Sequence, residues 1–597
     1  MPAITMDSTS AIPPTESAEY WADTIRQNLQ IARYSIDENS DDEHAQTRID
    51  ETIMEAPRRG TTRRELASQV AAKLYPDHPP DSLAPIIQYE KDIVSLRALV
   101  QEHRRSAVSK ATKENESHNF AKRIQKQGPW DPVKDPLPLT GASSLPMPVE
   151  VSDKESLAPF FAHLRDNGTH QVSKNGEGSA GIEPYYNVEL IEFEKGVLYS
   201  DGRVDLCKIA TGPRNIGDLM NSLKPNTSSK HFLLGNNIIG PVGADSIASF
   251  IEEFPDRFET WYLAGNCIDA ASFGRLVNSM VKSPVITNVW LKRNPLGRDA
   301  AKDVFRLITQ SPNLRTLDLD QTELGDEGVA ELFTLLTNHS KPHKLRHIYL
   351  NAVGISTQAC SQISLYLASP SCALTSLFIS NNPIGPALAT LAPGLAANST
   401  LERLSLQSCG LSDASTTPLL RALKNHPLKT LDLGQSYATE DLGTRYNWLS
   451  DAQPLVDLAT TTPSLQYLNL SSTPMPQEAL NSLLAAVAKS NTLLSFHAKS
   501  LVRGDPAAVH AGQEGKRLQR LVNLRLSGNV WEKLGVHYNR FNAELKRFLV
   551  SPEDVRLIDS VYRNRDAGRA RRGEGRLEKW WGEGDETLKM IGDGMVE

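Results

Sequence analysis

Apolar residues recur along the chain in one short phrase that is repeated at nearly constant intervals. The phrase reads L-x-L-x-x-N-x-L/I, and its alternating start has the period of two that is typical of a strand. Successive phrases begin 26 to 31 residues apart, apart from one interval of 37. They begin at Phe232, Trp261, Val289, Leu317, Ile348, Leu377, Leu404, Leu431, Leu468, Leu494 and Leu524, with a degenerate forerunner at Val204.

The segments between the phrases carry apolar residues at helical spacing. Examples are GDEGVAELFTLLTNH, residues 325–339, and EALNSLLAAVAKS, residues 478–490. A period near 3.6 residues predicts an amphipathic helix with one buried face. The chain therefore predicts a series of strand-plus-helix units of about 28 residues each.

Units of this kind resemble leucine-rich repeats, in particular the long ribonuclease-inhibitor-like subclass. Two glycine motifs of that subclass follow the strand, at residues 239–244 (IGPVGA) and 324–329 (LGDEGV). The resemblance implies an α/β fold, a curved right-handed solenoid with a parallel sheet on its concave face. It also implies that a buried turn asparagine recurs, here Asn237, Asn266, Asn294, Asn382 and Asn529. Other residues replace it in the remaining units: Thr322, Val353, Cys409, Ser436, Thr473 and Lys499.

The middle residue of each L-x-L phrase should point away from the helices, into the concave face. Four such residues within five consecutive units are aromatic: Tyr262, Trp290, Tyr349 and Phe378. Lys292, Asp318 and Asp320 lie in the same region, with Asp318 interrupting the stripe. Large rigid aromatics with a few charges are typical of protein-binding surfaces. We therefore predict an exposed protein-binding surface, although rings that merely stack and stiffen the sheet remain the alternative.

The interval of 37 residues indicates an insertion near Tyr446 and Trp448. Insertions into repeat proteins gather on one face and often carry function. The candidate loop site at these two residues and a neutral surface loop are equally compatible with the sequence.

Composition shifts divide the chain into six segments. We expect a disordered N-terminus (1–16), a helical region (17–126), a Pro/Gly-rich linker (127–185), a β-hairpin cap with the degenerate repeat (186–230), the repeats proper (231–532) and a mixed-charge tail (533–597). The hairpin should turn at Asp201-Gly202 and cover the open edge of the sheet. Trp580 and Trp581 in the tail are expected to anchor it on the last helix of the solenoid.

Charge and cysteine content bear on the class of partner and on the cellular compartment of the chain. The net charge of −7 over 597 residues favours no class of partner. The five cysteines lack metal-site spacing and indicate reduced thiols, hence a cytoplasmic protein with a nuclear location as a second option. No apolar run is long enough to cross a membrane. The run RNRDAGRARR, residues 563–572, is more typical of a solvated face than of a nucleic-acid patch, so nucleic acid is not the expected partner.

Catalytic and metal-binding motifs are missing from the sequence, and we predict no cofactor and no metal. GEGSAG, residues 176–181, has no strand before it or helix after it, and His339, His343 and His347 are interrupted by Pro342. The preferred function is a non-enzymatic scaffold that recognises a protein on its concave face. The alternative is a GTPase activator resembling Ran GTPase-activating protein, a family built from the same repeats but with an acidic tail and no large helical N-terminal region.

Overall fold

The computed structural model describes most of the repeat region and parts of the flanks. The described residues are 17–37, 56–57, 64–79, 83–93, 130–131, 133, 141–142, 144, 146, 151–171, 178–183, 188–435, 446–498, 509–543 and 549. The chain divides into two compact units, Met1–Lys122 and Arg123–Glu597. The expected disordered segment 1–16, the basic run 563–572 and the Trp580–Trp581 pair lie outside the described residues.

The first unit is a small helical bundle with its own core. Helix α1 (Ala18–Asp37) packs on α3 (Arg64–Leu74) and on a helical segment at residues 84–93. The residues expected to form the apolar faces are buried together: Trp21, Ile25, Ile86, Tyr89 and Ile93. The Tyr89 hydroxyl donates to the carbonyl of Pro57 at 3.0 Å, so its polar end is satisfied inside the bundle. The prediction of a helical N-terminal region is confirmed.

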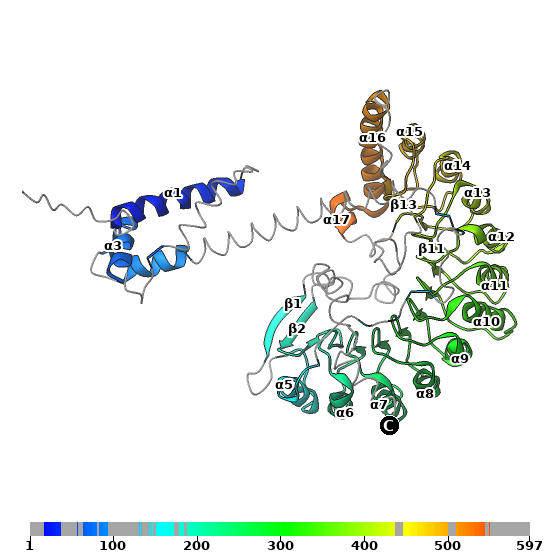
Figure 1. Ribbon diagram of the computed structural model, residues 1–597, viewed down its shortest axis with the longest axis horizontal. Coiled ribbons are helices and arrows are strands. Elements are labelled where there is room, and N and C mark those ends of the chain that lie inside the picture. Colours follow the sequence, from blue (N-terminus) through cyan, green and yellow to red (C-terminus); the bar gives the residue numbers. More distant parts are fainter. Residues whose placement is uncertain are drawn as a thin grey trace, which may run out of the picture. The chain divides into compact units, whose positions relative to one another are not determined.

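The second unit is a curved solenoid whose strands line the inside (Figure 1). Among its described residues, 14 strands form one sheet in sequence order, antiparallel at the start and parallel from β4 to β14. The strands are β1 (Ser179–Glu183), β2 (Val188–Phe193), β3 (Gly196–Tyr199), β4 (Arg203–Asp205), β5 (His231–Leu233), β6 (Thr260–Tyr262), β7 (Asn288–Trp290), β8 (Thr316–Asp318), β9 (His347–Tyr349), β10 (Ser376–Phe378), β11 (Arg403–Ser405), β12 (Thr430–Asp432), β13 (Tyr467–Leu470) and β14 (Ser495–Ala498).

Helices cover the outer side of this sheet (Figure 1). One continuous apolar core, from Leu157 to Leu526, fills the space between helices and strands, as expected when neighbouring repeats supply each other's core. The helices are α6 (Gly212–Leu223), α7 (Gly240–Glu253), α8 (Ala270–Met280), η2 (Arg298–Ala300), α9 (Ala301–Gln310), α10 (Gly325–Thr337), α11 (Thr357–Leu367), η3 (Gly385–Leu391), α12 (Ala392–Ala397), α13 (Asp413–Ala422), α14 (Gln453–Thr461) and α15 (Gln477–Val487).

The N-terminal end of the solenoid is capped by more structure than the sequence indicated. The expected turn at Asp201-Gly202 joins the antiparallel strands β3 and β4, and β4 pairs in parallel with β5. However, β1 and helix α5 (Lys154–Arg165) lie inside the segment that we expected to be a linker. Helix α5 buries Leu157, Phe160 and Leu164 in the solenoid core, so this part of 127–185 belongs to the fold.

The C-terminal end differs from the expected repeat pattern in two ways. Residues 524–531, taken as the eleventh repeat strand, belong to helix α16 (Val509–Leu534), where Leu524 is 70% exposed. Helix α17 (Tyr538–Ala543) follows it. In β14, Phe496 and not Leu494 lies beside Leu468, which makes that interval 28 residues. The solenoid therefore ends at β14, and α16 packs against α15 as its terminal helix.

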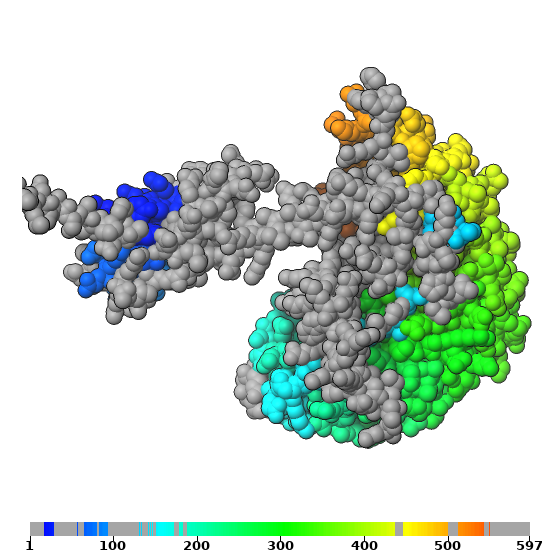
Figure 2. Space-filling view, in the orientation of Figure 1, coloured from blue at the N-terminus to red at the C-terminus, as the bar shows by residue number. Residues whose placement is uncertain are grey.

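An extended segment before α5 lies along the loops that follow the repeat strands. We call its described residues, between 130 and 152, the rim strap. Trp130 packs on Gly410. The backbone N–H of Ala142 donates to the carbonyl of Ala352 at 3.0 Å, and the Ser144 hydroxyl donates to the Glu323 carboxylate. The rim strap runs in the direction opposite to the order of the repeats, because its C-terminal end lies beside the first of them. There the backbone N–H of Ser152 donates to the carbonyl of Ala210 at 2.8 Å. Figure 2 shows strap residues as light-blue atoms over green repeats.

Glycine is required where the rim strap approaches the repeat backbone most closely. Gly141 has a φ of 87°, and a Cβ there would lie 2.5 Å from the Val353 carbonyl carbon. The Pro-rich sequence thus folds onto the solenoid at this point instead of forming a free linker.

Candidate protein-binding site

Two tryptophans illustrate how strand register separates the core from the concave face. Trp261 lies at the inward position of β6, where the rings of Phe232, Phe250 and Phe258 surround it at centroid distances of 5.1 to 6.4 Å. Trp290 lies at the outward position of β7, beside Tyr262 on β6. Because side chains alternate along a strand, the two indoles face opposite sides of one sheet. The register predicted from the sequence is confirmed here.

The outward aromatics form a separate cluster, which we call the concave aromatic cluster: Tyr262, Trp290, Tyr349 and Phe378. Ring centroids are 5.9 Å apart from Tyr262 to Trp290, 5.4 Å from Trp290 to Tyr349 and 4.2 Å from Tyr349 to Phe378. Trp290 and Tyr349 therefore meet across the intervening strand β8. The expectation that Asp318 interrupts the stripe is wrong, because its carboxylate accepts the backbone N–H of Asp320 at 2.9 Å and leaves the rings in contact.

This cluster is covered, contrary to the exposed surface that we expected. Trp290 and Tyr349 are each 2% exposed and Tyr262 is 7% exposed, while Phe378 is half-buried. Asp318 and Asp320 are also buried. Stacking between the rings, the alternative interpretation of the sequence, is observed. A role in binding remains a prediction for these residues.

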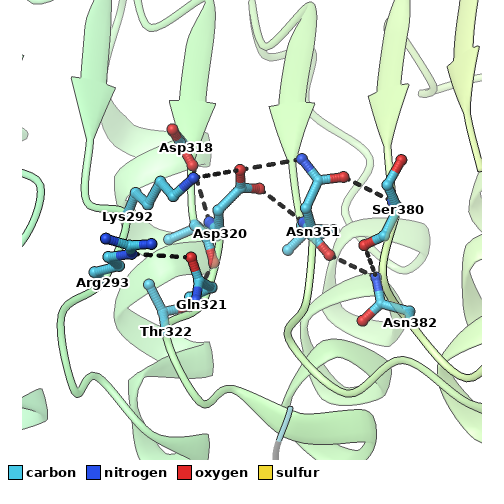
Figure 3. Close-up of polar contacts among 11 residues, drawn as sticks. Lys292, Arg293, Asp318, Asp320, Gln321, Thr322, Asn351, Ser380 and Asn382 are labelled. Atoms are coloured by element: carbon cyan, nitrogen blue, oxygen red, sulfur yellow. Dashed lines mark hydrogen bonds and ion pairs between the residues drawn. The ribbon is translucent and has the colours of Figure 1, made fainter. Parts of the chain in front are cut away.

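A row of polar side chains lies two residues after the middle residue of each L-x-L phrase, and Figure 3 shows Lys292, Asp320, Asn351 and Ser380 of this row. Lys292 approaches Asp320 with Nζ 3.9 Å from Oδ2. The Asp320 carboxylate also accepts the backbone N–H of Asn351 at 2.7 Å and its side-chain amide at 3.0 Å. Asn351 then accepts the backbone N–H of Ser380 at 2.7 Å. The predicted site residues Lys292 and Asp320 are thus joined in a network that the sequence did not reveal.

The same polar row continues toward the C-terminal strands. The Ser380 hydroxyl accepts the N–H of Gln407 at 3.0 Å, and the Gln407 amide donates to Asp432 at 2.7 Å. Asn469 donates to the other Asp432 oxygen at 2.9 Å. Burial raises the pKa of the Asp432 carboxyl, and these hydrogen bonds partly oppose that effect. The row thus links successive repeats through hydrogen bonds between side chains and backbone.

Buried asparagines join the repeats at the turn that follows each strand. Asn294 accepts the N–H groups of Asn266 and Ile268, both at 3.0 Å, and donates to the carbonyls of Leu263 and Leu291. Asn382 makes the same kind of contacts with residues 353–355. The structural role predicted for these asparagines is confirmed. Asn529 is an exception, because it lies in α16 and donates to the carbonyls of Ser490 and Leu493.

The candidate loop site belongs to this ladder as well. Asn447 accepts the N–H groups of Cys409 and Leu411 and donates to the carbonyl of Leu433, so it takes the place that we had assigned to Ser436. Its neighbour Tyr446 is buried and Trp448 is half-buried. Both residues thus pack against the repeats, and a role of this segment in binding remains a prediction. The signal was present, because N-W-L at 447–449 repeats the N-x-L of the phrase.

Catalytic chemistry finds little support in the described part of the chain. That part contains no group of three or more His, Cys, Asp or Glu residues arranged to hold a metal ion. His343, one of the histidines considered above, has its pKa lowered to about 4, chiefly by burial, and its Nε2 lies 3.1 Å from the Tyr366 hydroxyl. All five cysteines are free thiols, and burial raises the pKa of Cys267 to about 12. Such groups are poorly suited to proton transfer or nucleophilic attack near neutral pH.

Similarity to known proteins agrees with the fold. A family model described as "Leucine Rich repeat" matches residues 310–333 and 397–415. Pig ribonuclease inhibitor is 30% identical over 33% of this chain and 42% of its own length. Mouse "NACHT, LRR and PYD domains-containing protein 5" is 25% identical over 25% of this chain and 15% of its own length. The matches thus span less than half the length of either relative.

Among solved structures, the chain matches the tropomodulin C-terminal domain of Caenorhabditis elegans at 17% identity and a TM-score of 0.21. That match covers 29% of this chain and 98% of the other. Within the described residues, the helices are too short or too polar to cross a membrane.

Proposed function

Because the chain is a leucine-rich repeat protein of the ribonuclease-inhibitor-like kind, we propose that it is a non-enzymatic scaffold whose concave face recognises a protein partner. The observation that carries this proposal is the concave aromatic cluster. Four large rings stand on the side of the sheet that faces away from the helices and from the solenoid core. A solenoid needs no such residues for its own stability, because its repeats already share a continuous core.

The chemistry of this face defines the kind of partner that it suits. Tyr262, Trp290, Tyr349 and Phe378 form a continuous apolar stack in which Phe378 is the half-buried member, and stacked rings of this kind lose little side-chain entropy on binding. The polar row with Asp320 and Asp432 runs beside them. Apolar contact next to carboxylates favours a partner segment that combines aromatic or aliphatic side chains with arginine or lysine.

The test is capture followed by identification. A photoreactive amino acid placed at Phe378, which is half-buried, should cross-link to one protein in intact cells. The same group at Leu365, which is exposed on the outer helix α11, serves as the control. Equal cross-linking from both positions would contradict recognition by the concave face.

A GTP-hydrolysis assay separates the alternative function from the preferred one. The full chain should leave the rate of GTP hydrolysis by Ran unchanged at concentrations where the captured partner is saturated. A large acceleration would replace the scaffold proposal by the GTPase-activator proposal.

A further inference from the structure

The terminal helix α16 has an apolar stripe on its outer side. Leu524 is 70% exposed, Trp531 57% and Leu521 40%. Gly528 lies between them in sequence, and a Cβ at that position would meet nothing within 4 Å. At 3.6 residues per turn these four positions fall within about 80° of one another around the helix axis. We call the four residues the end stripe.

The opposite side of α16 packs on the solenoid. Leu518, Val522 and Leu526 are buried there in the continuous core. Figure 1 shows α16 beside α15 at the end of the row of outer helices. The end stripe therefore lies where the helix of a further repeat would pack. Among the described residues β14 is the last strand of the sheet, so no further repeat covers the stripe.

An apolar stripe at this place is unusual for a repeat protein. Terminal units normally carry a polar outer face, because no neighbour buries it. On the other outer helices of the described solenoid, large exposed apolar residues stand singly, as Val242 does on α7 and Leu365 on α11. Single residues of this kind are ordinary, whereas a contiguous group marks an interaction surface.

The end stripe is complementary to itself. When two copies of α16 cross antiparallel with Gly528 on a twofold axis, positions equally far before and after Gly528 come opposite each other. Leu524 then lies within one residue, about 1.5 Å along the helix, of Trp531 of the second copy. Because Gly528 has no side chain, the two helices can approach closely enough for these side chains to pack.

Charges beside the stripe favour the same arrangement. Arg525 and Glu532 are exposed and lie on one edge of the stripe, two turns apart. In the antiparallel pair each Arg525 comes within one residue of the level of Glu532 of the second copy, on the same edge. A parallel pair would instead bring the exposed Arg520 next to its own copy, which is unfavourable.

We propose that the end stripe joins two copies of this chain into a symmetric dimer through an antiparallel pair of α16 helices. The stripe spans ten residues, about 15 Å, so the contact is smaller than a standard interface of roughly 800 Å² per partner. The dimer is therefore weak, with a dissociation constant on the order of 10 μM.

A dimer of this kind carries two concave faces. A partner with two binding segments would engage the second face at a high effective concentration and so bind with avidity. This consequence rests on the proposed function, whereas the dimer itself does not.

Sedimentation of the full chain, from about tenfold below to about tenfold above that dissociation constant, tests the dimer. The wild type should change from monomer to dimer over this range. Leu524→Glu should stay monomeric with an unchanged melting temperature, because Leu524 is exposed. Leu365→Glu, at an exposed leucine of α11, is the matched control and should dimerise as the wild type does.

A charge exchange tests the pairing of the two edges. Arg525→Glu and Glu532→Arg should each weaken the dimer about fivefold, because each one places like charges opposite each other. The double variant R525E/E532R restores both pairs with their signs reversed and should dimerise nearly as well as the wild type. A double variant weaker than either single one would contradict the antiparallel arrangement.

Oxidative cross-linking measures the orientation of the helices. Gly528→Cys places a thiol at the twofold axis, so two copies should form a disulfide. Gln513→Cys places a thiol on the same exposed side but about 22 Å from the axis, and it should not cross-link above the wild-type background. Cross-linking from Gln513→Cys instead would overturn the proposed geometry.

Two results would overturn the dimer itself. One is a wild type that stays monomeric at the highest concentration, which is expected when another segment of this chain or a different protein covers the stripe. The other is a dimer that Leu524→Glu leaves unchanged. Neither result bears on recognition by the concave face, because these measurements need no partner.

Discussion

The two faces of the repeat sheet are both buried, but for different reasons. Trp261 on the helix side is 1% exposed and Trp290 on the concave side is 2% exposed. Trp261 belongs to the core that spans all repeats, whereas Trp290 belongs to a small cluster with Tyr262, Tyr349 and Phe378. Burial by itself therefore does not show whether a side chain belongs to the core that all repeats share. What distinguishes the two tryptophans is the cluster of side chains in which each one packs.

The largest expected effect separates the two tryptophans. Trp261→Ala should lower the free energy of unfolding by about 3–5 kcal/mol, because it leaves a cavity among the rings of Phe232, Phe250 and Phe258. Trp290→Ala should cost less than half as much, because Trp290 packs in the small concave aromatic cluster and not in the core that all repeats share. Urea denaturation of both variants measures the difference. Equal losses would show that the concave aromatic cluster is a second core and would remove the argument for a binding face.

The asparagine ladder lies between the two faces and should respond at every repeat. Asn294→Ala should destabilise by about 1–3 kcal/mol, because the buried N–H groups of Asn266 and Ile268 lose their acceptor. Asn447→Ala should behave in the same way, because it supplies Cys409 and Leu411 after the insertion. Gln310→Ala, at an exposed position at the end of α9, provides a control variant with little effect. An unchanged urea midpoint for Asn447→Ala would show that the segment with Tyr446 and Trp448 is a loop that does not stabilise the repeats.

The sequence predicted one face of the sheet much better than the other. Strand register follows from the alternation of apolar residues, so the inward column from Phe232 to Leu468 was placed correctly. The pattern failed at Leu524, where an L-x-L phrase lies in α16. Three residues are too few to distinguish the period of a strand from that of a helix. It also failed at Leu494, since Leu494 and Phe496 are both apolar and alternation cannot choose between registers separated by two residues.

Concave contacts were less predictable because they depend on geometry between repeats. Asp318 looked like a charge that breaks the stripe, but its carboxylate turns back to the backbone N–H of Asp320. The network of Asp320, Asn351 and Ser380 joins residues about 30 positions apart, and no local pattern encodes it. The rim strap likewise depends on where Gly141 meets Val353, which composition alone does not reveal.

A smaller effect concerns the dependence of stability on pH. Burial raises the pKa of Asp432, so its contribution to stability is fully present below the ordinary aspartate value and is lost as pH rises through the folded value. Asp432→Asn should therefore flatten the decline of stability in that pH window. Thermal denaturation over the acid range compares the variant with the wild type. The same slope of stability against pH for the variant and the wild type would show that the hydrogen bonds of the polar row fully compensate the burial of the Asp432 charge.

The smallest expected effect marks the end of the repeats. Leu524→Ala should change the free energy of unfolding by less than about 0.5 kcal/mol, because Leu524 is exposed on α16. Leu468→Ala, at the inward position of β13, should cost about 2–5 kcal/mol. Comparable losses for the two leucines, measured by urea denaturation, would restore an additional repeat strand at residues 524–531.

The most direct test of the central claim is the affinity of the captured partner for two matched variants. Phe378→Ala removes a half-buried ring from the concave aromatic cluster, and Leu365→Ala removes an exposed side chain from the outer helix α11. Titration by calorimetry should show about thirtyfold weaker binding for Phe378→Ala, equivalent to about 2 kcal/mol, and wild-type binding for Leu365→Ala. Wild-type affinity for Phe378→Ala, with the fold intact, would contradict recognition through the concave face.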